Sequence, residues 1–195
     1  FGMSCYAFVS EDRIACAWNR NGLWSLGLLD TGSQHRRDLG ITGRDFSYVR
    51  ATASRIVVKA GAPDKPAAIL QIDLSSGACQ SLKQSSPPPG PELQPLLSPG
   101  QPYEFPAGNG EKAYAFFYRP RNPEFAGPAD DRPPLLVKCH GGPTSAATNT
   151  LDLRTQYWTS RGYAVLDVNY GGSTGYGRRY RDRLKGQWGV VDVQD

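Results

Sequence analysis

The sequence lacks any apolar run close to the roughly 18 residues that a membrane-spanning helix requires. It also lacks a basic segment followed by an apolar one at its start, so no secretory leader is indicated. These absences argue against a membrane protein of the helical class, and we expect a cytoplasmic location. Phe1 opens directly on strand-like sequence, without an initiator methionine, and we expect the chain to be a fragment of a longer protein; a processed terminus would look the same.

Cysteine is scarce and irregularly spaced. No two of the four cysteines form a Cys-x-x-Cys pair, so neither a zinc site nor a redox motif is predicted. Three of them lie in apolar, strand-like surroundings, where cysteine usually behaves as a small buried hydrophobe. We therefore expect four free thiols and no metal or other cofactor; the four residues are Cys5, Cys16, Cys79 and Cys139.

Histidine is scarcer still, since the chain holds only His35 and His140. The letters of Gly171–Gly175, Gly-Gly-Ser-Thr-Gly, match the Gly-x-Ser-x-Gly nucleophile elbow of hydrolases. An elbow serine needs a later histidine as its base, and no histidine follows Ser173. We therefore interpret this segment as a flexible loop rather than as a nucleophile site. His140 has no second ligand at metal spacing, and we expect it to pack the loop in which it lies.

The net charge is also small, because the chain contains 22 basic and 18 acidic residues. This balance does not predict nucleic-acid binding. The basic cluster between Arg178 and Lys185 has Asp182 among its members and is interpreted as a solvated helix face. Asp192 and Asp195 lie three residues apart, and we expect them to act as helix caps or salt-bridge partners.

Short strand-like runs separated by turn signals fill residues 1–83 and predict antiparallel β structure. Leu26–Gly32 and Leu70–Gly77 look like two copies of one strand-turn unit, with glycines about 45 residues apart, close to the period of a propeller blade. A blade cannot bury both faces alone, so two blades imply further neighbours. A small β-sandwich is the alternative.

Proline is dense from Ser85 to Pro102, which suits an extended crossing between domains. We place the boundary near Ser98, giving a domain at 1–98 and another at 99–195. At the start of the second domain, residues 103–118 resemble a hairpin around the turn at Gly108–Gly110. This hairpin would form the antiparallel edge of the following sheet.

The second domain then shows a strand, a helix and a strand. Residues 135–137 are an apolar strand, residues 150–161 have helix-compatible spacing that leads into Gly162, and residues 163–168 are again a strand. This order is typical of a parallel sheet. A further helix is expected at residues 178–188, closed or kinked by the glycines near its end.

The loop His140–Pro143, His-Gly-Gly-Pro, follows the first of these strands directly. Glycines let the backbone approach a substrate closely, and proline stiffens the exit. Such a loop in hydrolases aims backbone N–H groups at an oxygen that becomes negative during acyl transfer. A tight strand-to-helix turn without a catalytic role is the alternative.

Three motifs together resemble the prolyl oligopeptidase family of serine peptidases, in its acylaminoacyl-peptidase and dipeptidyl-peptidase-like branch. They are His140–Pro143, Asn169–Gly177 and Gly186–Asp195. The resemblance implies a mixed fold, in which antiparallel β-propeller blades at 1–98 precede the amino-terminal portion of an α/β-hydrolase domain. It is specific over residues 101–195 and only architectural before that.

The same resemblance implies a serine-type peptidase that hydrolyses short peptides through an acyl-enzyme. Gly142, with Gly141 as its neighbour, would supply one backbone donor of the oxyanion hole, while the nucleophile, acid and base would all lie beyond Asp195. This chain alone is therefore predicted to be inactive. Many relatives carry arginine where this chain has Gly171, so a substrate-facing arginine is not expected there.

The expected partner is a peptide substrate, with no nucleic acid and no membrane, and a homo-oligomer is one expectation for the full-length protein. Two other functions remain open from the sequence. The parent protein could be a non-catalytic scaffold that binds protein partners through its propeller, or a carboxylic-ester hydrolase with a similar glycine loop.

Overall fold

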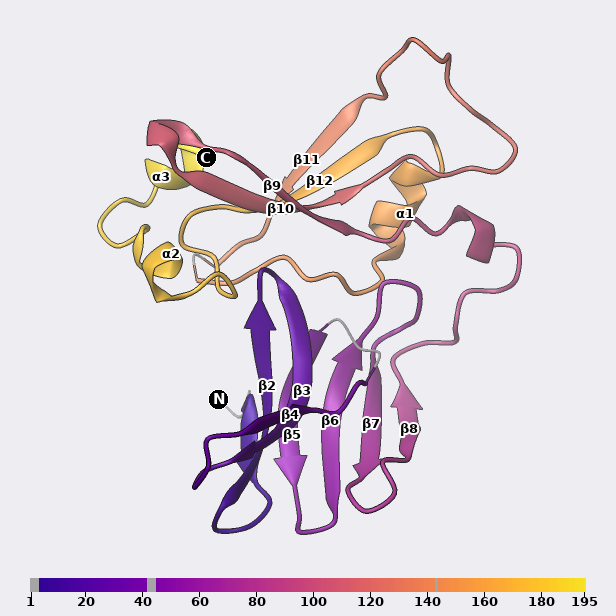
Figure 1. Ribbon diagram of the computed structural model, residues 1–195. Helices are drawn as coiled ribbons and strands as arrows, with labels where there is room; N and C mark the ends of the chain where they lie inside the picture. Colours follow the sequence, from indigo (N-terminus) through magenta and orange to yellow (C-terminus); the bar gives the residue numbers. More distant parts are fainter. Residues whose placement is uncertain (1–3, 42–44, 143) are drawn as a thin grey trace. The chain divides into compact units, whose positions relative to one another are not determined.

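The computed structural model describes residues 4–41, 45–142 and 144–195 (Figure 1). It consists mostly of antiparallel β-sheet with few helices. The chain divides into two compact units, Phe1–Pro88 and Pro89–Asp195, which are described separately below. In the described part, the helices are too short or too polar to cross a lipid bilayer.

The first unit contains two four-stranded antiparallel sheets, in each of which the strands are neighbours in chain order (Figure 1). The first sheet comprises β1 (Tyr6–Phe8), β2 (Arg13–Arg20), β3 (Leu23–Asp30) and β4 (Arg36–Asp38). The second comprises β5 (Asp45–Ala51), β6 (Arg55–Gly61), β7 (Ala68–Asp73) and β8 (Cys79–Gln84). The two sheets share one apolar core, to which Leu26 contributes from the first sheet and Phe46 and Ile72 from the second.

The sequence repeat corresponds to the third strand of each sheet and the turn after it. Asp30 ends β3, and its carboxylate accepts the Ser33 N–H at 2.7 Å. Asp73 ends β7 in the same way and accepts the N–H groups of Ser75 and Ser76 at 3.0 and 2.9 Å. Hydrogen bonds from these two serines, the Ser75 hydroxyl first, hold the pKa of Asp73 well below its usual range. The predicted strand-turn copies are thus confirmed.

The structure divides between Pro88 and Pro89, earlier than the boundary near Ser98 that the proline density predicts. Ser98 belongs to the second unit because it is buried there: its N–H donates to Gln156 Oε1 at 2.7 Å, and its hydroxyl donates to the Arg119 carbonyl at 2.7 Å. A turn at residues 91–93 leads directly into a 3-10 turn, η1 (Gln94–Leu96), in this segment. Proline is compatible with this turn because it lies at the start of it.

The second unit is built on one four-stranded sheet in the order β11-β12-β10-β9. Its strands are β9 (Gln101–Pro106), β10 (Lys112–Tyr118), β11 (Leu135–Cys139) and β12 (Ala164–Asn169), and the turn η2 (Gly108–Gly110) joins β9 to β10. β9 and β10 form the predicted antiparallel hairpin, with β9 at the edge. β11 and β12 are parallel and are connected through α1 (Leu153–Thr159), which confirms the predicted strand-helix-strand unit.

Helix α1 exposes its apolar residues and buries polar ones. Its apolar residues Leu153, Tyr157 and Trp158 are 57%, 49% and 40% exposed, whereas the polar Thr155, Gln156 and Thr159 are buried. Gln156 is fixed there because its amide also donates to the Ser98 carbonyl, at 3.1 Å. Gly162, with φ +88°, ends this segment as predicted.

Asp152 caps α1 and also binds the sheet. Its carboxylate accepts the Arg154 N–H at 3.0 Å and the Thr155 hydroxyl at 3.1 Å, and it pairs with Lys138 of β11 at 3.3 Å. Burial opposes ionisation, but these hydrogen bonds and the lysine together keep the pKa of Asp152 below its ordinary value.

Replacing Asp152 by alanine is expected to lower the free energy of unfolding of the second unit by about 1 kcal/mol, the usual loss for a helix cap. The pKa of Asp152 is lower in the folded protein than in the unfolded protein. The stabilisation by the charged carboxylate is therefore fully present at pH values above the unfolded pKa, and it is lost as the pH falls through the folded pKa. Urea midpoints at pH 7 and pH 3 measure the difference. Asp152→Asn is the matched control, since asparagine keeps the cap and removes only the charge; a larger loss for the asparagine variant than for alanine contradicts the account.

After β12 the chain forms two short helices, α2 (Arg178–Asp182) and α3 (Val191–Gln194), instead of the single helix expected at 178–188. Gly186 and Gly189 both have positive φ, +66° and +81°, which ends helical geometry between them. Leu184 from this region packs on Ala115, Val168 and the Tyr170 ring, and these residues form the core on one side of the sheet.

Candidate functional site

Two glycine-containing loops follow the carboxyl ends of β11 and β12. We call residues 140–149 loop A and residues 170–177 loop B; Pro143, the predicted stiffener of loop A, lies outside the described residues. β11 and β12 are parallel neighbours, so their carboxyl ends meet at the same edge of the sheet. That edge is where open α/β sheets bind ligands.

Gly141 and Gly142, the predicted oxyanion donors, form an exposed turn immediately after β11. Gly142 has φ +105°, a conformation that side-chain-bearing residues rarely adopt. Among the described residues, no acceptor takes the N–H of either glycine, and no atom lies within 4 Å of the position that a Gly141 β-carbon would occupy.

His140 begins loop A and is held by two residues of loop B. Its Nε2 lies 2.7 Å from the Ser173 hydroxyl, and its ring stacks on the Tyr170 ring with centroids 4.5 Å apart. The Tyr170 hydroxyl also donates to the His140 carbonyl at 3.2 Å. The predicted packing role of His140 is therefore confirmed, with Tyr170 and Ser173 as partners that the sequence did not indicate.

The His140–Ser173 pair has the spacing of a base and a nucleophile, but Ser173 is not accessible from solvent in this structure. Its side chain has no exposed surface. A substrate carbonyl must come within about 3 to 3.5 Å of the attacking oxygen, and the packed protein around Ser173 prevents that approach. The interpretation of Gly171–Gly175 as a false elbow agrees with this burial.

Two further hydrogen bonds hold loop A, one to loop B and one to the end of β12. The Thr174 N–H of loop B donates to the Ser145 carbonyl of loop A at 2.9 Å. The Ala147 N–H of loop A donates to Asn169 Oδ1 at 2.8 Å. Asn169 is the last residue of β12 and is fully buried. The sequence marked Asn169 as the first residue of the motif Asn169–Gly177, but its contact with loop A was not predicted, although a polar residue that ends an apolar strand is a signal for such a contact.

The base of loop B is fixed by a buried ion pair. Arg183 and Asp195 approach to 2.8 Å, with side chains 16% and 2% exposed, and the second Asp195 oxygen accepts the Gly171 N–H. Asp195 is therefore a salt-bridge member as predicted, and Asp192 accepts the Gly189 N–H at 2.7 Å. The expectation of a solvated basic cluster is wrong for Arg183, because Asp195 and the Tyr180 ring bury its guanidinium.

A hollow of about 390 Å³ lies between β11 and α1. Lys138 stands in it and pairs with Asp167 at 2.9 Å and with Asp152 at 3.3 Å. Burial disfavours the charged lysine, but the two carboxylates outweigh it and raise the pKa of Lys138. Lys138 is therefore held as a cation, which suits a structural ion pair and not a general base.

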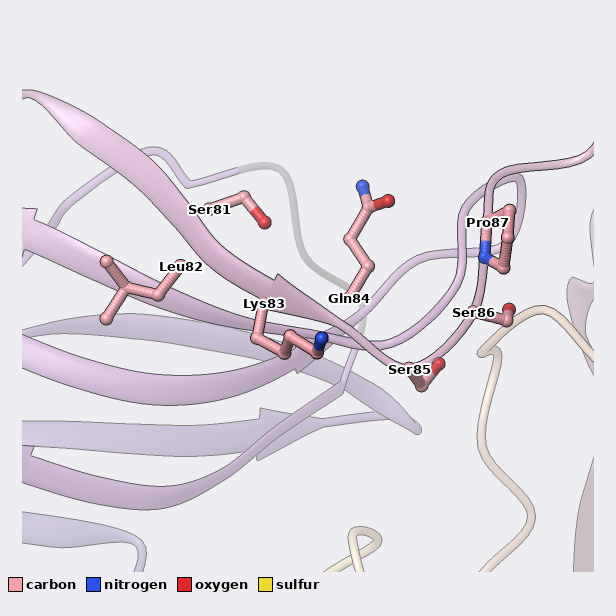
Figure 2. A pocket seen from close by; sticks show the side chains of 7 residues that line it. All are labelled: Ser81, Leu82, Lys83, Gln84, Ser85, Ser86 and Pro87. Carbon is pink, nitrogen blue, oxygen red and sulfur yellow. The ribbon is translucent and has the colours of Figure 1, made fainter.

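A second hollow lies in the first unit along the edge strand β8. Figure 2 shows that its lining comes from one continuous segment, Ser81–Pro87, and all seven residues are exposed. Lys83 is the one ionisable side chain among them, and no carboxylate or histidine accompanies it. This lining lacks the acid-base pair that catalysis requires.

Within the described ranges, no three histidine, cysteine, aspartate or glutamate residues stand close enough to hold a metal ion. The four cysteines are free thiols, as predicted. The expectation that cysteine is buried here is wrong, because Cys5, Cys79 and Cys139 are exposed and Cys16 is half-buried. Cys79 and Cys139 lie in β8 and β11, at positions that face solvent, and Cys5 lies just before β1.

Comparison with known proteins places these loops in a family. A model of the prolyl oligopeptidase family matches residues 149–195. Dipeptidyl aminopeptidase BIII of Pseudoxanthomonas mexicana is 31% identical over 134 residues, which are 68% of this chain and 19% of that protein. Acylamino-acid-releasing enzyme of Arabidopsis thaliana is 40% identical over 62 residues, 32% of this chain and 8% of that protein. The chain belongs to the prolyl oligopeptidase family.

Solved structures extend the similarity over both units. A puromycin-hydrolyzing peptidase of Mycobacterium tuberculosis is 37% identical and matches 100% of this chain with a TM-score of 0.90, while the match covers 29% of that chain. Acylaminoacyl peptidase of Pyrococcus horikoshii, 18% identical with a TM-score of 0.69 over 99% of this chain and 29% of its own, shows likeness of fold alone. This prolyl oligopeptidase family chain therefore spans less than a third of the length of these relatives.

The family match and the candidate site overlap only in part. Residues 149–195 contain loop B, α2 and α3, whereas Gly141 and Gly142 precede the match. The glycines fall within the region shared with the puromycin-hydrolyzing peptidase, which covers the whole chain. The two loops of this prolyl oligopeptidase family chain are nonetheless one structural unit, because they are joined by hydrogen bonds between His140 and Ser173, from the Tyr170 hydroxyl to the His140 carbonyl, and from the Thr174 N–H to the Ser145 carbonyl.

Proposed function

We propose that this chain is part of a longer serine-type peptidase that hydrolyses short peptides through an acyl-enzyme. The first unit would be two blades of a β-propeller, and the second would be the amino-terminal part of an α/β-hydrolase domain. The observation that carries the proposal is the exposed turn at Gly141 and Gly142. Its N–H groups meet no acceptor in the described protein and lie at the sheet edge where such enzymes bind substrates.

The chemistry assigned to this turn is stabilisation of an oxyanion. When a serine oxygen attacks the scissile carbonyl, its proton passes to a base and the carbonyl oxygen becomes negative. A backbone N–H fixed at that oxygen stabilises the charge only once it has formed, so it lowers the barrier and leaves substrate binding little changed. Gly142, with Gly141 beside it, supplies this donor, and the nucleophile, acid and base belong to the part of the protein beyond Asp195.

The substrate class follows from the relatives. Those named above act on dipeptidyl, acylamino-acid or puromycin substrates. Puromycin carries an aminoacyl amide, whose hydrolysis needs the same oxyanion donors as a peptide bond. The identity of 37% over the whole chain favours aminoacyl amides, puromycin included, as a second candidate substrate beside short peptides.

An active-site-directed fluorophosphonate tests the proposal. The longer protein is expected to be labelled at one serine beyond Asp195 and to cleave aminoacyl or dipeptidyl anilides. The chain of 195 residues is expected to remain unlabelled and inactive. Labelling of Ser173 or of any other serine in this chain would overturn the assignment. Absence of labelling and of hydrolysis in the longer protein would support a binding scaffold instead.

A further inference from the structure

Asn169 connects four elements through one buried residue. Its Oδ1 accepts the Ala147 N–H of loop A at 2.8 Å, and its Nδ2 donates to the Tyr176 hydroxyl of loop B at 3.0 Å. Its backbone carbonyl, at the end of β12, accepts the Tyr180 hydroxyl of α2 at 2.7 Å. The residue has no exposed surface. Its side chain thus ties loop A to loop B at the end of the sheet.

The position of Asn169 matters because few contacts hold the glycines of loop A directly. Gly141 and Gly142 have no side chains, and among the described residues no acceptor takes either N–H. The Gly141 carbonyl lies 3.1 Å from His140 Nδ1, so the remaining support comes from anchors on either side of the glycines. His140 is the anchor before them, through Ser173 and the stack on Tyr170. The anchors after them are Ser145, which Thr174 holds, and Ala147, which Asn169 holds.

From this geometry we propose that Asn169 is a positioning residue for the oxyanion donors. It holds the carboxyl-terminal half of loop A against loop B, so that the glycine N–H groups stay aimed at one point. The inference rests on the proposed function, because the donors act only if the protein carries out acyl transfer. Asn169 touches no substrate and acts through Ala147.

Asparagine suits this position because one short side chain must both accept and donate. The carbonyl oxygen serves the Ala147 N–H and the amide serves the Tyr176 hydroxyl. Burial raises the pKa of Tyr176 to about 12, so its hydroxyl stays protonated. The hydroxyl accepts from the Asn169 amide, and it could instead donate to a carboxylate at position 169. Aspartate at position 169 would therefore keep both contacts, whereas alanine would leave the Ala147 N–H buried without an acceptor.

The test compares three variants of the longer protein. Asn169→Ala removes the bridge, and Asn169→Asp keeps its geometry. Gln156→Ala is the matched control, because the buried amide of Gln156 also makes two hydrogen bonds in this unit, and both described bonds go to Ser98 and not to either loop. The values of kcat and KM are measured on an aminoacyl anilide. Hydrogen exchange at the Ala147 amide is measured in parallel.

Asn169→Ala is expected to lower kcat by about 10- to 100-fold, approaching the loss of about 10²- to 10³-fold that follows removal of a donor. KM should stay within about twofold, because the donors act in the transition state. Asn169→Asp should retain at least about a third of the wild-type kcat. Gln156→Ala should retain the wild-type kcat even if its melting temperature falls.

Wild-type kcat in Asn169→Ala, or an equal loss in Gln156→Ala, would overturn the inference. If Asn169→Ala fails to fold, an Asn169→Asp variant that is folded but has lost kcat overturns it as well. Hydrogen exchange at the Ala147 amide tests the positioning role of Asn169 separately from the proposed peptidase function. If the Ala147 amide is as protected from exchange in Asn169→Ala as in the wild type, the bridge is refuted, whatever the activity of the variant. A wild-type protein that neither reacts with fluorophosphonate nor hydrolyses the anilide refutes the proposed function instead.

Discussion

Replacing Gly172 by alanine is expected to lower the free energy of unfolding of the second unit by about 3 to 5 kcal/mol. Gly172 has φ +115°, and a β-carbon there would lie 2.6 Å from Leu184 Cβ and 2.7 Å from Leu184 Cδ2. Backbone strain and overpacking each cost roughly 1 to 3 kcal/mol. Leu184 cannot move aside easily because it is buried in the core against Tyr170.

Denaturant titration read by peptide-resolved hydrogen exchange over residues 89–195 measures this loss. The matched control is Gly127→Ala in the same unit. Gly127 is exposed, is not among the positive-φ glycines, and has no atom within 4 Å of the added β-carbon among the described residues. Its variant should stay within about 0.5 kcal/mol of the wild type. Equal stability of the two variants would show that loop B is not packed on Leu184.

The second large effect distinguishes two roles for Ser173: a nucleophile with His140 as its base, or a buried residue that holds the His140 ring. Removal of the nucleophile of a serine protease lowers kcat by about 10⁶-fold. Ser173 is buried and serves only to hold His140, so Ser173→Ala in the longer protein should keep kcat within about tenfold of the wild type. His140→Ala should lose more, because it removes the stack on Tyr170 as well and leaves the Ser173 hydroxyl without a partner.

Steady-state kinetics on an aminoacyl anilide measure both variants, with fluorophosphonate labelling as the control for an intact nucleophile. Both variants should still be labelled, since the proposed nucleophile lies outside this chain. A loss of labelling in Ser173→Ala would identify Ser173 as the nucleophile. A smaller loss of kcat in His140→Ala than in Ser173→Ala would show that the ring does not hold loop A.

Sequence reasoning recovered the elements that have strong local signals. The turn at Gly108–Gly110 between two strand-like runs predicted the hairpin of β9 and β10, and the strand-helix-strand order predicted the parallel pair of β11 and β12. Gly162 ended its helix as expected because its positive φ is a local requirement. The glycine repeat marked equivalent strands, since the same turn closes both of them at Asp30 and Asp73.

Features that depend on contacts between distant segments were not predictable in the same way. The spacing of Leu153, Tyr157 and Trp158 indicated a helix but not which face it buries, because Gln156 fixes that face through Ser98, 58 residues earlier. Arg183 looked like one of several solvated basic residues until Asp195 and Tyr180 enclosed it. The bridge through Asn169 likewise needs loops A and B together.

The central claim is that the backbone N–H of Gly142 stabilises an oxyanion. An ester in place of the peptide bond between Gly141 and Gly142, introduced into the longer protein with glycolate at position 142, removes that N–H without adding any side chain. The account predicts that kcat for an aminoacyl anilide falls by about 10²- to 10³-fold while KM changes little. A kcat within about threefold of the all-amide protein would contradict it.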